Sequence, residues 1–267
     1  MAYREHEAPS GLERHVELIW THVSDDRELH RIAPDGRCEV IVHLGEPYLE
    51  QAQGRWAAQP VALFAGQLTR PLHLRGNGPM STISARLAPS TAGAFLGQDA
   101  SASTDQRVPL GDIDPNSQPL AAMLRGCSDE AQRVRLFGEY LVARFASSPL
   151  RPDPRVGQAI ARIEASDRPD LGTIALGLNI SARQLERLFR IHVGIPAGTY
   201  CSIIRFRRLF DLLSGGERTW SDAAAEAGYS DHPQMAREFQ RFLGCSATEF
   251  IRDRAHLAAA MTQPRAH

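Results

Sequence analysis

The sequence contains no lysine, so every one of its 30 basic side chains other than histidine is an arginine. A guanidinium group can hold a phosphate or a guanine edge with two parallel hydrogen bonds, which suits nucleic-acid recognition. A genome that favours arginine codons explains the same bias equally well. The absence of lysine therefore identifies no function by itself.

Closely spaced cysteines and long apolar runs are also missing. The four cysteines are scattered and form no C-x-x-C pair, which argues against a structural zinc site or a disulfide framework and favours buried or idle thiols. No stretch approaches the ~20 apolar residues of a membrane-spanning helix. Residues 1–20 carry acidic and polar residues where a signal peptide has its apolar core. We therefore expect a protein without a membrane segment that stays in the cytoplasm.

The charges are unevenly distributed, although the net charge is only −1. Residues 1–150 contain 14 arginines and 18 acidic residues, whereas residues 151–267 contain 16 arginines and 13 acidic residues. The excess is densest in residues 181–208, where six arginines accompany a single acidic residue, Glu186. Local positive charge attracts a phosphate backbone, so the C-terminal part is the candidate for binding nucleic acid.

Three prolines between residues 147 and 154 divide the chain. Proline fixes φ and lacks a backbone donor, so neither a helix nor a central strand is expected there. We predict an N-terminal domain over residues 1–147, a linker over 148–154 and a C-terminal domain over 155–255.

The N-terminal domain is predicted to begin with short strands, at residues 38–44, 60–66, 71–76 and 80–87, which are rich in apolar and β-branched residues. Glycine and proline turns separate these segments. This spacing is typical of a small barrel or sandwich.

Residues 118–146 then change to helical spacing. Four apolar residues share one helix face, which would either pack on the barrel or pair with a second subunit: Val134, Phe137, Leu141 and Phe145. All segments after the linker are predicted to be helical. The fold class is thus α+β, with a small N-terminal β-barrel or sandwich flanked by helices and an all-α C-terminal domain.

Residues 170–194 predict a first helix-turn-helix motif. A short apolar helix ends near Asn179, a residue type that tolerates the left-handed conformation of a tight turn. Ser181 then caps a second helix, which Gly194 ends. Its outer residues belong to types that read base edges or bind phosphate: Arg183, Gln184, Glu186, Arg187 and Arg190. An ordinary amphipathic helix with a solvated charged face would show the same pattern.

A second copy of the pattern occupies residues 219–244. A short helix with small inward residues ends at Gly228, and Ser230 or Asp231 caps the next helix, whose early Pro233 does no harm there. The outer face or edges of this helix are expected to carry His232, Gln234, Ala236, Arg237, Gln240 and Arg241.

A constant offset relates the two copies, because Phe189 and Phe239 lie 50 residues apart, as do Gly194 and Gly244. Residues 196–216 between them are predicted to form one helix, ended by Gly215-Gly216. About 16 residues at ~1.5 Å each would hold the motifs roughly 25 Å apart. Successive major grooves on one DNA face are ~34 Å apart, so this spacing is compatible with both motifs docking on one DNA.

Over roughly residues 155–253 the sequence resembles the AraC/XylS family of bacterial transcription regulators. The resemblance rests on L-x-x-I-A-x-x-L-x-I-S (171–181), R-Q-L-E-R-L-F-R (183–190), A-x-x-A-G-Y-S-D (224–231), R-E-F-Q-R-F-L-G (237–244) and C-S-A-T-E-F (245–250). It implies that the groove-facing positions of the two recognition helices are Arg183, Glu186 and Arg187, and His232, Pro233, Ala236 and Arg237. Residues 34–45, 65–72 and 85–97 are similar to a sensor-type domain that precedes the motif in some members.

The sequence departs from the family pattern in its second motif. Met235 replaces a common phenylalanine, while Pro233 and Ala236 stand where polar base-reading residues often occur. We therefore expect the first motif to dominate base reading and the second to contribute more phosphate anchoring.

No nucleophile, base and orienting carboxylate can be assembled from the sequence. His30, His43 and His73 lie among predicted strands without H-x-H spacing, so neither a metal nor a cofactor is expected. The alternative is an enzyme with a catalytic N-terminal barrel and a helical domain for protein contacts.

The favoured interpretation is a transcription regulator that binds double-stranded promoter DNA and is controlled by a small-molecule effector through residues 1–147. A second copy of the chain and RNA polymerase are further expected partners. We predict Arg183, Arg187 and Arg237 for groove contacts, and Arg190, Arg205 and Arg241 for phosphate contacts.

Overall fold

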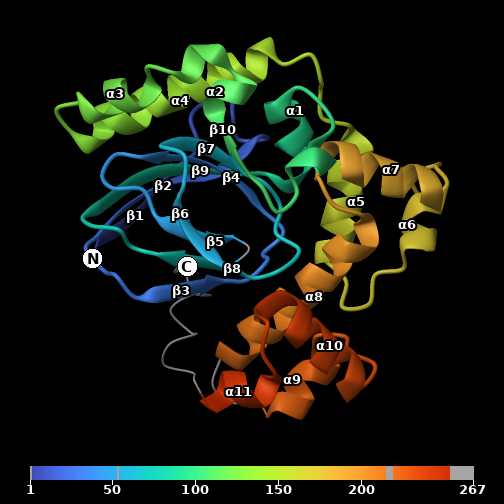
Figure 1. The fold of residues 1–267 in the computed structure, drawn as a ribbon. Coiled ribbons are helices and arrows are strands. Elements are labelled where there is room, and N and C mark those ends of the chain that lie inside the picture. Colours follow the sequence, from blue (N-terminus) through green and yellow to red (C-terminus); the bar gives the residue numbers. More distant parts are fainter. Residues whose placement is uncertain (1, 53, 215–218, 253–267) are drawn as a thin grey trace.

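The computed structural model describes residues 2–52, 54–214 and 219–252. An N-terminal domain of β-sheets with flanking helices precedes a C-terminal domain of helices (Figure 1), which confirms the predicted α+β fold class. None of the helices in these ranges is both long and apolar enough to cross a membrane.

Two antiparallel sheets form the N-terminal domain. The larger has the order β1-β2-β9-β4-β7-β10 and the smaller the order β3-β8-β5-β6. The strands of the larger sheet are β1 (Ala2–His6), β2 (Val16–Ser24), β4 (Cys38–His43), β7 (Ala62–Ala65), β9 (Met80–Leu87) and β10 (Arg107–Pro109). Those of the smaller are β3 (Leu29–Ile32), β5 (Leu49–Ala52), β6 (Arg55–Ala58) and β8 (Leu72–Arg75). The four predicted strands correspond to β4, β7, β8 and β9.

The larger sheet has one apolar face and one polar face, because side chains alternate along each strand. Val40 and Val42 of β4 belong to the apolar core, which also contains Phe95 and Phe137. Helices provide the other half of this core (Figure 1). They include α1 (Ala92–Leu96), α2 (Leu110–Ile113), α3 (Leu120–Arg125) and α4 (Glu130–Ser147), with 3-10 turns η1 (Pro89–Thr91), η2 (Ala100–Ser103) and η3 (Pro115–Ser117).

The apolar face predicted for residues 118–146 packs on the sheet. Phe137 and Leu141 of α4 are fully buried and Phe145 nearly so, all within the N-terminal core. Of the two alternatives for this face, the structure therefore shows packing within the chain. A different, exposed face of α4 remains at the surface.

Seven helices make up the described part of the C-terminal domain. They are α5 (Pro154–Glu164), α6 (Leu171–Leu176), α7 (Ala182–His192), α8 (Ala197–Ser214), α9 (Trp220–Glu226), α10 (His232–Leu243) and α11 (Ala247–Arg252). The long helix α8 lies between the pairs α6–α7 and α9–α10, as predicted. Gly215-Gly216, expected to end α8, lies outside the described residues.

The two domains share part of one core at the turn that leads into β4. Ala33 is buried among the residues of the C-terminal core. Gly36, at φ +80°, packs so closely on Tyr200 of α8 that an added Cβ would lie 3.0 Å from its ring. Arg37 Nη1 donates to the Tyr200 hydroxyl (3.1 Å) and to Glu164 of α5 (3.2 Å).

A second contact joins α1 to the end of α7. A Cβ at Gly93 would lie 2.3 Å from the carbonyl oxygen of Ile191, so only glycine permits this approach of the two backbones. Nearby, the Thr104 hydroxyl donates to the carbonyl of Gly194 (2.6 Å). The first helix-turn-helix segment is thus attached to the N-terminal domain by backbone contacts as well as side chains.

Candidate nucleic-acid interface

The first motif has the local geometry that its sequence predicts. Asn179 turns the chain at φ +54° between α6 and α7. Ser181 accepts the backbone N–H of Gln184, whose side chain in turn accepts the N–H of Ser181, which is a capping box. Leu185 and Phe189 then face the core. The charged side of α7 consequently faces outward.

The second motif repeats this geometry with a different cap. Gly228 makes the turn at φ +93°, and Gly244 ends α10 at φ +68°. Of the two predicted caps, Asp231 is the one used, because its carboxylate accepts the N–H of Gln234 at 2.7 Å. Pro233 lies in the first turn of α10, where its missing donor is harmless.

Five of the predicted DNA contacts are exposed arginines on the two outer faces. Arg183, Arg187 and Arg190 project from α7, and Arg237 and Arg241 from α10. No hydrogen bond or ion pair with another described residue engages any of these guanidinium groups. The exposed His232, at the start of α10, accompanies them. Each motif therefore presents unpaired cationic groups to solvent.

The two predicted glutamines are partly committed to helix caps. The side-chain oxygen of Gln184 accepts the N–H of Ser181, and that of Gln234 accepts the N–H of Ser230. A glutamine reads adenine with both its oxygen and its nitrogen. As placed here, each offers only its NH₂ group without breaking the cap.

Glu186 differs from the prediction that it faces a DNA groove. Its carboxylate accepts the backbone N–H groups of Ala197 (3.0 Å) and Gly198 (3.4 Å). These N–H groups lie in the first turn of α8 and therefore have no partner within the helix. The negative charge of Glu186 is also stabilised by the positive end of the helix dipole. Glu186 thus joins α7 to α8.

Arg205 also differs from its predicted role as a phosphate contact. Its guanidinium forms an ion pair with Glu238 of α10 and lies 5.1 Å above the ring of Tyr229. The Arg205 side chain is only 20% exposed, so a DNA phosphate would have to displace an internal carboxylate to reach it.

Two further arginines of residues 181–208 form hydrogen bonds to backbone carbonyls of the same chain. Arg207 donates to the carbonyl of Asp35 (2.9 Å), and Arg208 to the carbonyls of Ser166 (2.9 Å) and Glu164 (3.0 Å). Half of the six arginines in residues 181–208 therefore support the fold. The other half, all on α7, remain available to DNA.

No group of three or more histidine, cysteine or acidic side chains within the described ranges has the arrangement of a metal site. The buried His43 lies beside Gln59 and Thr82, which bind its two ring nitrogens. Burial lowers the pKa of His43 to about 4, so its ring is neutral at physiological pH.

Comparisons with known proteins agree with this geometry. Residues 174–253 match a family described as a helix-turn-helix domain, and residues 4–109 match a domain of unknown function (DUF6597). The HTH-type transcriptional regulator GbdR of Pseudomonas aeruginosa is 28% identical over 93 residues. That alignment covers 34% of this chain but only 25% of the relative, so the similarity spans about a quarter of the relative's length.

Solved structures with a related overall course include ToxT from Vibrio cholerae, bound to an unsaturated fatty acid. It is 8% identical with a TM-score of 0.49, and the match covers 90% of this chain and 95% of that chain. The AraC-like transcriptional activator CuxR is 18% identical with a TM-score of 0.30, covering 84% and 90%.

The sequence motifs, the two capped helix-turn-helix units and the family matches coincide on the same residues. Residues 174–253 are thus a helix-turn-helix domain of the kind found in AraC-type transcription regulators, and residues 4–109 are a DUF6597 domain.

Proposed function

We propose that this protein regulates transcription by binding double-stranded promoter DNA with α7 and α10. The observation that carries the proposal is the set of unpaired, exposed arginines on the outer faces of both helices. In this proposal Arg183, Arg187 and Arg237 contact base edges, and Arg190 and Arg241 contact phosphates. Because α7 carries three free arginines and α10 carries two, the first motif contributes more to sequence choice.

Binding of the full chain to fragments of its own upstream DNA tests this proposal. Replacing Arg183 or Arg187 by alanine should cost ~1–3 kcal/mol and relax discrimination at one base pair. Arg190→Ala should weaken all sequences alike and lower the slope of log K against log salt by about 1. Arg55→Ala, which removes an exposed arginine from the N-terminal domain, is the matched control. Binding that ignores salt concentration contradicts the proposal.

We further propose that a small-molecule effector acts through the N-terminal domain. On the polar face of the larger sheet, His22, Thr82 and His43 lie side by side on β2, β9 and β4. Tyr48 reaches this row from outside the sheet, with its hydroxyl 3.3 Å from His22 Nδ1. His43 is buried and bonded to Gln59 and Thr82, so in this proposal an effector with several hydrogen-bonding groups acts by replacing those bonds.

Thermal-shift screening of small polar metabolites would find such an effector. Its stabilisation of the chain should disappear in His43→Phe while Arg55→Ala retains it. An effector whose stabilisation is the same in His43→Phe does not bind at this row.

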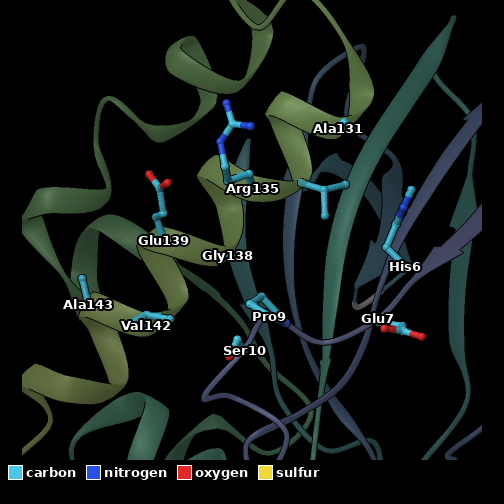
Figure 2. Close-up of a pocket in the computed structure, with 11 residues that line it drawn as sticks. His6, Glu7, Pro9, Ser10, Ala131, Arg135, Gly138, Glu139, Val142 and Ala143 are labelled. Carbon is cyan, nitrogen blue, oxygen red and sulfur yellow. The ribbon is translucent and has the colours of Figure 1, made fainter.

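A homodimer is also proposed, through the exposed face of α4. A groove of about 660 Å³ runs between α4 and the loop after β1, with Val142 and Pro9 on its walls (Figure 2). Arg135 and Glu139 lie at its rim, one helical turn apart, and neither forms an ion pair with another described residue. A two-fold antiparallel pairing of α4 places each arginine opposite the second copy's glutamate, so the surface is complementary to itself.

Sedimentation of charge-reversed variants tests the dimer. Arg135→Glu and Glu139→Arg should each weaken association, and the double variant should restore it. Equal association of all three with wild type would exclude this surface.

A further inference from the structure

A buried polar cluster connects the second recognition helix to the helix between the motifs. Glu238 of α10 pairs with Arg205 of α8 and accepts the Tyr229 hydroxyl at 2.7 Å. Tyr229 belongs to the turn between α9 and α10 and is almost fully buried. Glu238 itself is only 8% exposed, although the two residues before it, Ala236 and Arg237, are exposed to solvent.

The surroundings of Arg205 and Tyr229 raise the pKa of both groups. Burial acts to lower the pKa of Arg205, but its hydrogen bonds to Glu238 outweigh this and raise the pKa. Burial, followed by the nearby charge of Glu238, raises the pKa of Tyr229. At physiological pH the guanidinium is therefore charged and the phenol is a neutral donor.

We infer that Arg205, Glu238 and Tyr229 form a positioning triad that fixes the rotation of α10 about its own axis. The triad thereby sets the direction in which the DNA-facing side chains of α10 project. This inference rests on the proposed DNA-binding function and adds to it the means by which the second motif is aimed.

The reason lies in the difference between apolar and polar contacts. Phe239 of α10 packs on Phe206 and Phe210 of α8, at ring-centre distances of 5.2 and 5.7 Å. Such contacts hold the helices together but depend on direction less steeply than hydrogen bonds do. Hydrogen bonds weaken steeply as they leave their preferred angles, so the triad resists a rotation that the phenylalanine contacts would tolerate.

The consequence of a small rotation can be estimated from helix dimensions. A side chain ends about 6 Å from the helix axis, so a turn of roughly 20° moves its tip by about 2 Å. A hydrogen bond to a base is about 3 Å long, so a displacement of this size breaks it. Arg237 lies next to Glu238 in the sequence, so the rotation of Glu238 sets that of Arg237.

A role in stability alone is a poor explanation for the triad. A buried ion pair adds little stability compared with apolar residues of the same volume, because both charges lose their hydration. The double variant Arg205→Met with Glu238→Leu uses this property. It fills the same space and leaves no unpaired charge, yet it removes every directional bond of Glu238.

The experiment uses the full chain and an operator located by footprinting of the wild type. Loss of protection in Arg237→Ala identifies the half-site that α10 contacts. Affinities are then measured for the operator, for DNA scrambled in that half-site, and for DNA scrambled in the half-site of α7. Each affinity ratio measures the discrimination contributed by one motif.

We expect the double variant to lose at least about fivefold of the discrimination at the α10 half-site, with less than twofold change at the α7 half-site. Tyr229→Phe should lose less, because the ion pair remains. Glu238→Gln can still accept hydrogen bonds from Arg205 and Tyr229, so it should retain part of the discrimination that the double variant loses. Melting temperatures of the same variants show whether each remains folded.

Two results would overturn the triad. One is a folded double variant whose α10 discrimination equals that of the wild type, and the other is an equal loss at both half-sites that follows the melting temperature. Failure of the wild type to discriminate at either half-site would instead refute the proposed function itself.

Discussion

Replacing Tyr200 by phenylalanine tests whether the contact between the domains stabilises the whole chain. The Tyr200 ring is fully buried, and its hydroxyl donates to Glu164 (2.7 Å) while accepting from Arg37 (3.1 Å). Burial raises the pKa of Tyr200 well above its ordinary value, so the hydroxyl keeps its proton at neutral pH. The substitution removes only one oxygen and leaves the ring packing intact.

The magnitude follows from the charged partners. A hydrogen bond to a charged group contributes about 1.5–3 kcal/mol. Two such bonds are lost, but Arg37 and Glu164 still pair at 3.2 Å, and the Glu164 side chain is 35% exposed, so water replaces part of the loss. We therefore expect a decrease of about 1.5 kcal/mol in the free energy of unfolding. For a chain of this size the melting temperature should fall by ~3–6 °C.

Urea unfolding followed by circular dichroism measures this change. Tyr3→Phe is the control, because the Tyr3 hydroxyl donates to Glu5 two residues away on an edge strand. Its loss should stay within about 0.5 kcal/mol, as for other surface substitutions. A Tyr200→Phe effect no larger than that of the control would show that the contact between the domains contributes nothing to stability.

Further predictions concern backbone contact and pH. Gly93→Ala should destabilise the chain by more than about 2 kcal/mol, because the added Cβ would lie 2.3 Å from the Ile191 carbonyl oxygen. Gly111→Ala is the control and should be neutral or slightly stabilising, because the space around Gly111 is open. Thermal or urea unfolding measures both. The free energy of unfolding should fall between pH 7 and pH 5: burial lowers the pKa of His43 from an unfolded value of ~6.5 to about 4, so over this range the unfolded state binds a proton that the folded state does not. This single group accounts for about 2 kcal/mol at pH 5. His43→Gln should therefore show a shallower pH dependence in urea unfolding, and an unchanged slope would contradict the assignment.

Local signals in the sequence predicted the elements and the outer faces of the two motifs. The strand at 80–87 and the helix after Ser181 follow from alternation, periodicity and a capping residue, all of which act within a few positions of the chain. The exposed placement of Arg183 and Arg187 followed from the same periodicity, since Leu185 and Phe189 had to face the core.

The internal roles of Glu186 and Arg205 could not be predicted in this way. Both are charged residues at positions where helical periodicity allows exposure. Their partners, the first turn of α8 for Glu186 and Glu238 for Arg205, become neighbours only when separate helices pack. Ala33 gave no signal either, because a small residue before a turn is compatible with many environments. Contacts between distant segments decide such roles, and a single sequence does not display them.

The buried Ala33 and the loop that ends at Arg37 bear on how far the two domains can be separated. A fragment that starts at the linker would lack these residues and would expose the ring of Tyr200 and the part of the C-terminal core next to Ala33. Exchange of N-terminal domains between related proteins at this linker should therefore give poorly folded chimaeras unless residues 33–37 are transferred together with the helices. The segment that can be transferred between proteins is thus discontinuous in sequence. It consists of the helical domain together with residues 33–37, the turn that leads into β4.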